Sequence, residues 1–303
     1  MPPKYSYLKP HLTINQQIQK LKSKGIKFNN LEETKHYLSH LNYYRLSAYW
    51  KSYPYKRTTI YFKRVLQDYF FDKEFRLLVL SAIESIEVSL RTQISAVLTQ
   101  RYGTHPHLNS NIFDEKYEID KLKVEYQRSN EDFARHFKQH YRESLPPMWV
   151  MVELMSLGQL SQMYKYIKKR KDRNAISAKY GLDSSILQSY IHQLTIIRNI
   201  SAHHGRLWNR RFTFNIKIPK NVKELQESSY QEGYYEKRNG KKIYISIKKI
   251  YNTLVFLKYM LDIIEPLHDW DIRLRELIYK YDIDVRKMGF PKNWKELAVW
   301  SRG

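Results

Sequence analysis

The chain has 303 residues, with 53 Lys and Arg against 30 Asp and Glu, a formal net charge of +23, and no cysteine. This length fits roughly one or two domains with a buried core, and the lack of cysteine excludes disulfides, a thiolate nucleophile and cysteine-ligated zinc. A positive excess of this size causes self-repulsion unless an anionic partner offsets it.

Helices are expected to dominate the fold, because only 9 glycines and 10 prolines interrupt the chain. Thr13 is a capping residue for a first helix that ends near Lys24, before Gly25. An interrupted helical segment is expected from Leu31 to Tyr49, and a long helix from Asp72 through Leu98.

The second half of the chain continues this helical pattern. After two consecutive prolines, a helix is expected from Trp149 to Lys169. Asp183 or Ser184 caps the next helix, which Gly205 ends. Three further helices are expected, at Ile250 to Ile264, Arg273 to Tyr281 and Trp294 to Trp300.

Two segments break the helical pattern, because apolar and polar residues alternate in them as they do in short strands. They are Phe212 to Ile218 and Ile243 to Ile247, and the residues between them are typical of an exposed hairpin arm. The predicted fold class is therefore all-α, a helical bundle with a small β-hairpin arm near residues 212–247.

The chain gives no sign of a membrane partner. Met1 to Leu12 lacks the apolar core of a signal peptide. The most apolar later stretch, Leu254 to Ile264, is too short to span a bilayer and contains Lys258. We therefore expect a cytoplasmic protein.

Reactive side chains are concentrated in the run from Arg198 to Arg210, at the end of a predicted helix. An arginine, an amide and two histidines occur there as Arg198, Asn199, His203 and His204. An imidazole can exchange a proton near neutral pH, and a guanidinium can hold a phosphate that gains negative charge. These are the groups that a ribonuclease without a metal ion needs.

Helical geometry separates these groups into two sets. At about 100° per residue, His192, Asn199 and His203 share one strip, whereas Arg198 lies on another side of the helix. Arg198 and His203 are about 140° apart. A shared site therefore requires the reach of the arginine, a distorted helix end, or groups from two chains.

The spacing of Arg198 and His203 resembles the R-x4-H signature of the HEPN superfamily of helical ribonucleases. The extended block, with His204 and Arg206-Leu207-Trp208-Asn209, is similar to the Abi (abortive infection) branch of the AbiD/AbiF-like type. Similar stretches elsewhere are Leu8 to Pro10, Leu41 to Ser47, Ile83 to Thr92, Trp149 to Glu153 and Leu157 to Ser161. Gly205 departs from the family, which more often has a larger residue there.

The resemblance implies a HEPN-type bundle in which two signature helices meet across a homodimer and form one composite site. It also implies a single domain over residues 1–303, with a helical extension over 1–60 and a helical core with the hairpin arm over 61–303. No metal or other cofactor is implied.

RNA carries its own nucleophile, the 2′-hydroxyl, so His203 need only remove that proton or deliver one to the leaving 5′-oxygen. Arg198 would neutralise charge on the phosphate, and Asn199 would orient the histidine or donate to a phosphoryl oxygen. Supporting roles fall to His204, Arg206 and Asn209. The alternative is structural, with both histidines capping helix carbonyls and Arg198 paired with a buried acid.

A metal site is a weaker alternative. Adjacent histidines such as His203 and His204 diverge on a helix. His105 and His107 are closer in spacing, but they lie in a proline-containing loop without nearby acids.

A second group of charged residues, Glu84, Glu87 and Arg91, falls within one narrow arc of the long helix, beside apolar positions that include Val88. We expect these three side chains to be half-buried, with Glu87 and Arg91 paired. A structural ion pair is the favoured interpretation; the alternative is that they orient Arg198 or His203.

The charge and the 26 tyrosines point to RNA as the anionic partner, because unpaired bases stack on flat aromatic surfaces. The alternative is that this composition reflects an AT-rich genome. The region from Tyr43 to Arg64 interleaves aromatic and basic residues, and although many of its rings must pack in the core, part of it is expected to bind RNA. The residues predicted to make contact there are Tyr44, Arg45, Lys51, Lys56 and Arg57.

A basic run is the other predicted RNA contact, although a solvated helix end is a close alternative. It consists of Lys168, Lys169, Arg170, Lys171 and Arg173.

Together with these observations, the resemblance implies an RNA-binding, metal-independent endoribonuclease that acts as a toxin in phage defence. The alternative is a noncatalytic binder of a structured noncoding RNA encoded nearby, as the resemblance also implies. A DNA-binding regulator fits the charge, but the chain lacks a clear recognition-helix signature.

Overall fold

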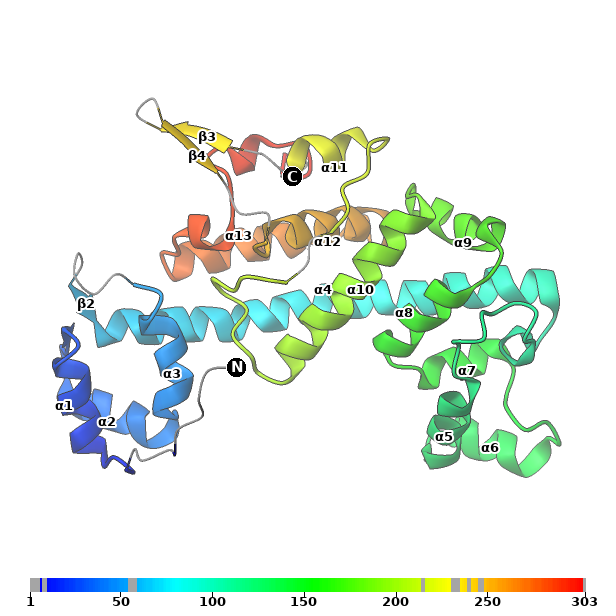
Figure 1. The fold of residues 1–303 in the computed structure, drawn as a ribbon, viewed down its shortest axis with the longest axis horizontal. Coiled ribbons are helices and arrows are strands. Elements are labelled where there is room, and N and C mark those ends of the chain that lie inside the picture. The colour runs from blue at the N-terminus through cyan, green and yellow to red at the C-terminus, as the bar shows by residue number, and fades with distance from the viewer. Residues whose placement is uncertain are drawn as a thin grey trace. The chain divides into compact units, whose positions relative to one another are not determined.

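The computed structural model describes residues 6, 10–53, 59–213, 216–229, 235–238, 241–244 and 248–301 (Figure 1). Its α-helices are α1 (Ile14–Lys22), α2 (Leu31–His40), α3 (Tyr43–Trp50), α4 (Phe62–Tyr102), α5 (Ile119–Arg128), α6 (Asp132–His140), α7 (Met148–Leu154), α8 (Leu157–Tyr166), α9 (Arg170–Ser177), α10 (Ser184–Ala202), α11 (Lys223–Ser228), α12 (Tyr251–Ile264) and α13 (Trp270–Lys280). Short 3₁₀ helices are η1 (Pro106–Leu108), η2 (Ala178–Tyr180), η3 (Val285–Met288) and η4 (Trp294–Glu296). The predicted all-α class is confirmed.

Strands are few and short in the described part of the chain. β1 (Ile26–Lys27) pairs in parallel with β2 (Ile60–Tyr61), and β3 (Tyr235–Arg238) pairs in antiparallel with β4 (Lys241–Tyr244). No helix in this part combines the length and the apolar character needed to cross a bilayer.

Contacts group the residues into two compact units, one of residues 1–74 and 277–283, the other of 75–276 and 284–303. The predicted division near residue 60 stays a prediction. In the first unit, Thr13 and Gln16 form a reciprocal capping box that starts α1 as expected. Gly25 follows the helix with φ +79°, a backbone conformation that favours glycine, and turns the chain into β1.

The second unit contains the helix with the Arg198 to Arg210 run. This helix, α10, packs against α8, α9 and α12, and Figure 1 shows α8, α9 and α10 as neighbours. Leu187 and Leu194 of α10 are completely buried, and the Tyr190 ring lies 5.0 Å from Phe256 of α12. Burial of several such side chains, at roughly 1.5 to 3 kcal/mol each, fixes the orientation of α10.

Helix α4 begins ten residues earlier than predicted, at Phe62 and not at Asp72. Asp72 is a preferred N-cap residue type, but here it is buried inside the helix and accepts a hydrogen bond from the Tyr49 hydroxyl at 2.7 Å. Asp72 therefore makes a tertiary contact and does not cap the helix.

The predicted helix from Trp149 to Lys169 is wrong in its continuity, because the chain breaks between α7 and α8. Ser156 caps α8, and its hydroxyl accepts from the Gln159 backbone while the Gln159 side chain accepts from the Ser156 backbone. At the C-terminus, the predicted helix Trp294 to Trp300 is only the 3₁₀ turn η4.

The hairpin lies inside the predicted range but uses different strands, and the stretch predicted to be an exposed arm also contains helix α11, whose Leu225 is buried. The described residues of Phe212 to Ile218 form no strand; instead the backbone N–H of Phe212 donates to Lys248 O at 2.8 Å. Of the second predicted strand, Ile243 and Tyr244 belong to β4, and residues 245–247 lie outside the described residues.

His107 of η1 should make stability depend on pH. Its imidazole is buried, and burial, together with the neighbouring His105, lowers its pKa to about 4, although a backbone hydrogen bond at Pro146 opposes the shift. An unfolded histidine titrates near 6.5. The unfolded chain therefore gains a proton first, and the stability from this group is lost as pH falls from about 6.5 to about 4, by about 3 kcal/mol in all.

Chemical unfolding of the wild type and of His107→Leu between pH 7.5 and pH 4.5 measures this effect. The leucine variant should lose less stability than the wild type over this interval. A replacement of the exposed His36 by alanine is the control and should follow the wild-type curve. Parallel curves for wild type and His107→Leu would contradict the prediction.

Candidate active site at the end of helix α10

Helix α10 presents a buried side and an exposed strip. Ile191 and Leu194 are buried against the neighbouring helices, whereas His192, Asn199 and His203 are exposed. The strip predicted from helical periodicity therefore faces away from the core. The side chains on this strip therefore lie at the surface of the second unit.

The end of α10 is closed by three backbone hydrogen bonds. The N–H groups of His203, His204 and Gly205 donate to the carbonyls of Asn199, Ser201 and Ile200 at 3.0, 3.1 and 2.7 Å. This is a Schellman motif, in which the residue after the cap adopts the left-handed conformation. That residue is His204, with φ +57°.

The sequence placed this helix stop at Gly205, one residue too late. Gly205 serves another purpose, because a Cβ added to it would lie 3.1 Å from both Cγ2 and the carbonyl oxygen of Ile200. Glycine therefore permits a close approach of the chain to the last turn of α10.

Arg198 is half-buried, and its Nη1 donates to Asn199 Oδ1 at 3.4 Å. This weak bond turns the guanidinium toward the strip of Asn199 and His203. Within the described residues, Arg198 forms no ion pair with a carboxylate, so the alternative of a buried acid partner finds no support there.

The two histidines at the helix end differ in backbone role. His203 is the C-cap residue, and His204 is the left-handed residue that follows it. Both are exposed, and it is their backbone N–H groups that close the helix. The described residues make no hydrogen bond to the His203 imidazole, so it can exchange a proton with a bound molecule.

The loop after the histidines is held by buried and polar contacts. Leu207 and Trp208 are buried, and the ammonium group of Lys287 lies 5.0 Å from the Trp208 ring centroid. Asn209 has φ +52°, and its Oδ1 accepts from Lys249 Nζ at 2.5 Å. The Asn209 side chain therefore has a structural role, because it holds Lys249 beside the loop.

Cations gather beside this loop. Burial and the nearby charges of Arg206 and Arg211 lower the pKa of the Lys249 side chain. No carboxylate among the described residues forms an ion pair with Lys249. Sequence reasoning missed Lys249, because it lies about 40 residues beyond the motif and its position depends on the fold.

Glu87 and Arg91 of α4 form an ion pair with an N–O distance of 2.7 Å. Arg91 also contacts Glu153 at 3.2 Å and donates to the carbonyl of Met155 at 2.8 Å, so it links α4 to the α7–α8 junction. Glu84 is exposed, as is Val88, so the half-buried arc predicted for this part of α4 is wrong for them. These contacts support the structural interpretation of the pair.

In the first unit, Tyr44, Arg45 and Lys51 are exposed, and Lys56 and Arg57 lie outside the described residues. Tyr49 and Trp50 are core residues. Tyr44 borders a hollow of about 600 Å³, whose lining also includes Lys20, His11, His40 and Tyr43. The ammonium group of Lys20 lies 5.9 Å from the Tyr43 ring centroid, so a cation and an aromatic face occur together there.

The basic run is divided between surface and structure. Lys169, Arg170 and Lys171 are exposed, whereas Arg173 donates to the carbonyls of Ile167 and Lys168 at the end of α8.

Two further residues of this segment make structural contacts. Lys168 Nζ donates to Ser110 O at 3.0 Å. Asp172 is buried and pairs with Arg101 and with the Tyr102 hydroxyl. The exposed cations of the run are therefore Lys168 to Lys171, and the ammonium group of Lys169 lies 5.3 Å from the Tyr102 ring centroid.

No group of three or more His, Asp or Glu side chains in the described part of the chain is arranged to hold a metal ion. His107 in particular is buried.

The left-handed conformation of His204 predicts an unusual effect of glycine. In the variants His204→Gly and His204→Ala the imidazole is lost alike, but only alanine retains the strain of φ +57°. We expect the glycine variant to be more stable than the alanine variant by about 1 kcal/mol in thermal or chemical unfolding.

Ala178 provides the matched control, since it is exposed and has φ −62°. There Ala178→Gly should destabilise the protein by roughly 0.5 to 1 kcal/mol. An alanine variant at position 204 as stable as the glycine variant would contradict the assignment of strain.

The comparisons with known proteins concern the same region. The family model described as Abi-like protein matches residues 36–209, more than half of the chain, including α10 and the loop to Asn209. Comparisons with curated proteins and with solved structures found no match. The chain therefore belongs to the Abi-like protein family.

Proposed function

We propose that this protein is an RNA-binding endoribonuclease of HEPN type, related to the AbiD/AbiF branch, that acts in the cytoplasm as a toxin of abortive-infection defence. The observation that carries the proposal is the end of α10, where Arg198 contacts Asn199 and His203 is exposed one turn later. The family match supports a role in abortive infection.

The chemistry uses groups of the chain and of the RNA. His203 removes the proton of a ribose 2′-hydroxyl, whose oxygen bonds to the adjacent phosphorus as the bond to the 5′-oxygen breaks. The leaving oxygen takes up a proton from solvent water, which gives a 2′,3′-cyclic phosphate and a 5′-hydroxyl. Arg198 stabilises charge that develops on the phosphoryl oxygens, an effect often worth several kcal/mol in a site shielded from water.

The cations after His203 support substrate binding. Arg206 and Arg211 lie close enough to Lys249 to lower its pKa, so their positive potentials add. A phosphodiester placed near His203 would relieve this repulsion. The positive potential of these side chains therefore favours a polyanionic substrate.

A composite site in a homodimer is part of this proposal. Arg198 and His203 start from directions about 140° apart on α10. Arg198 contacts Asn199, and within the described residues no hydrogen bond joins the Arg198 and His203 side chains. A second α10 across a two-fold axis would bring the arginine of one chain to the histidine of the other.

The second candidate function is noncatalytic binding of a structured noncoding RNA. It is favoured by the hollow near Tyr44, where Lys20 and aromatic rings provide binding groups. Such groups can stack on bases and attract phosphates without any chemical step.

Replacement of Arg198 or His203 by alanine separates the two functions. If these residues stabilise the transition state and move a proton, each replacement should reduce cleavage by a factor on the order of hundreds or more, with a much smaller change in RNA affinity. The assay measures cleavage in the presence of a chelator and identifies the cyclic phosphate at the new end.

Arg128→Ala and His36→Ala are matched controls, because both side chains are exposed and lie outside the α10 region. They should retain wild-type cleavage. If the wild type, tested with and without copurified RNA, cuts no RNA while cells that express it resist phage, the nuclease proposal is wrong and the binding function replaces it.

Mixed dimers test the composite site. When Arg198→Ala and His203→Ala chains are coexpressed with different tags, a heterodimer retains one site with both groups intact if each site takes its arginine and histidine from different chains. The purified heterodimer should then recover up to about half of the wild-type activity, whereas each homodimer stays inactive.

No recovery in the purified heterodimer would place both groups of each site in one chain. Size measurement in solution should show a dimer for the wild type and for both variants. An active monomer would also refute the composite site.

A further inference from the structure

A polar hollow lies beside α10, at a distance from His203. It has a volume of about 310 Å³ and is formed by side chains of α8 and α10 and by Lys217. The backbone N–H of Lys217 donates to Ser189 Oγ of α10 at 3.2 Å, which fixes this segment against the helix. The hollow therefore belongs to the packed part of the second unit.

We propose that this hollow binds the phosphodiester backbone of the RNA and directs the strand along α10 to His203. The proposal rests on the proposed function, because it names where the RNA of that reaction lies. The residues that carry it are Lys165, His192 and Lys217, with Gln162 and Gln188 beside them.

The lining has the chemistry of an anion site. Every residue that borders the hollow is polar, and the lining includes two lysines and a histidine but no carboxylate. Lys165 and Lys217 are exposed, and neither forms an ion pair with a carboxylate within the described residues. Phosphate oxygens in the hollow would accept hydrogen bonds from the ammonium and amide groups that line it.

The position on α10 explains why the ligand is a polymer. His192 lies on the same exposed strip as Asn199 and His203. The rise from residue 192 to residue 203 is about 16 Å along the axis, because each helical residue adds about 1.5 Å. A single phosphate cannot span this length, but an extended nucleic acid strand can contact both ends of the strip.

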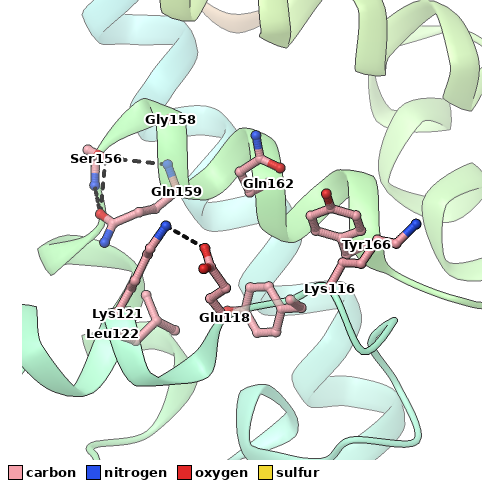
Figure 2. Close-up of a pocket in the computed structure, with 10 residues that line it drawn as sticks. Lys116, Glu118, Lys121, Leu122, Ser156, Gly158, Gln159, Gln162 and Tyr166 are labelled. Carbon is pink, nitrogen blue, oxygen red and sulfur yellow. Dashed lines mark hydrogen bonds and ion pairs between the residues drawn. The ribbon is translucent and has the colours of Figure 1, made fainter.

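A second hollow continues the path across α8. It has a volume of about 480 Å³ and shares Gln162 with the first. Figure 2 shows Gln162 and Tyr166 of α8 on one side of it, with Glu118 and Lys121 on the other.

The second hollow also has a positive balance. Lys121 pairs with Glu118, which leaves the positive charge of Lys116 uncompensated by the lining. Tyr166 adds an aromatic ring, and the ammonium group of Lys165 lies 4.9 Å from its centroid. Cations and a ring at the junction of the two hollows suit a phosphate and a base of one strand.

The test replaces Lys165 and Lys217 together by glutamine, which removes two charges from exposed positions. The probe is a fluorescent single-stranded 20-nucleotide RNA, and binding is measured in the His203→Ala background to prevent cleavage. Lys179→Gln with Lys220→Gln is the matched control, because both lysines are exposed and border neither hollow.

We expect the double variant at 165 and 217 to lose affinity by about tenfold or more at moderate salt. The slope of log affinity against log salt should become shallower by about 1.4, since each lost phosphate contact of a single strand contributes about 0.7. The control double variant should keep a slope within error of the parent. Unchanged thermal unfolding verifies that both proteins fold.

The possible failures are distinct. Suppose that the wild type binds and cuts RNA, but the variant at 165 and 217 has the same RNA affinity and salt slope as the control. Then the hollow does not bind the RNA backbone, and the proposed function stands. If the wild type binds no RNA, both fail. An equal loss of binding to RNA and to poly-glutamate would show general attraction of anions and would also overturn a site built for phosphodiesters.

Discussion

The closure of α10 is the constraint on which the candidate site depends. Three backbone N–H groups, from His203 to Gly205, satisfy carbonyls in the last turn, and this geometry forces His204 into the left-handed region. The chain then turns back so close to the helix that a Cβ atom at position 205 would lie only 3.1 Å from Ile200. Because of this reversal, Leu207 and Trp208 enter the core directly after two exposed histidines.

The loop after α10 contains both buried apolar side chains and charged side chains within a few residues. The apolar side chains of the loop provide the burial that holds it, and Asn209 is fixed through Lys249. The cost is a local excess of positive charge, because Lys249 is brought near Arg206 and Arg211. The positive potential of these side chains is one basis for the polyanionic partner proposed above.

No helix was predicted where α5, α6, α9 and α11 lie, but local signals in the sequence predicted some helix starts. Thr13 with Gln16 is an example, since the capping box needs only residues three positions apart. Ser156 and Gln159 have the same spacing and form a second capping box. The break between α7 and α8 could therefore have been predicted from the sequence. Asp72 led to a wrong helix start, because its carboxylate does not cap a helix but accepts a hydrogen bond from Tyr49. That contact depends on the tertiary fold.

The candidate site shows the same limit. Periodicity identified the strip of His192, Asn199 and His203, because a regular helix fixes these directions. It could not identify Lys165, Lys217 or Lys249, which approach α10 and its loop from other elements. Nor could it distinguish Arg173, whose guanidinium binds carbonyls at the end of α8, from the exposed lysines beside it.

The two proposals for α10 constrain each other. An RNA strand along the strip needs the surface between His192 and His203 to stay open, whereas a composite site needs two copies of α10 to approach near Arg198 and His203. Both conditions hold only if the helices cross near their C-terminal ends and diverge toward the Lys165 and Lys217 hollow. In that arrangement each chain would guide one strand toward the crossing point, where the arginine of one copy and the histidine of the other act on the same phosphate.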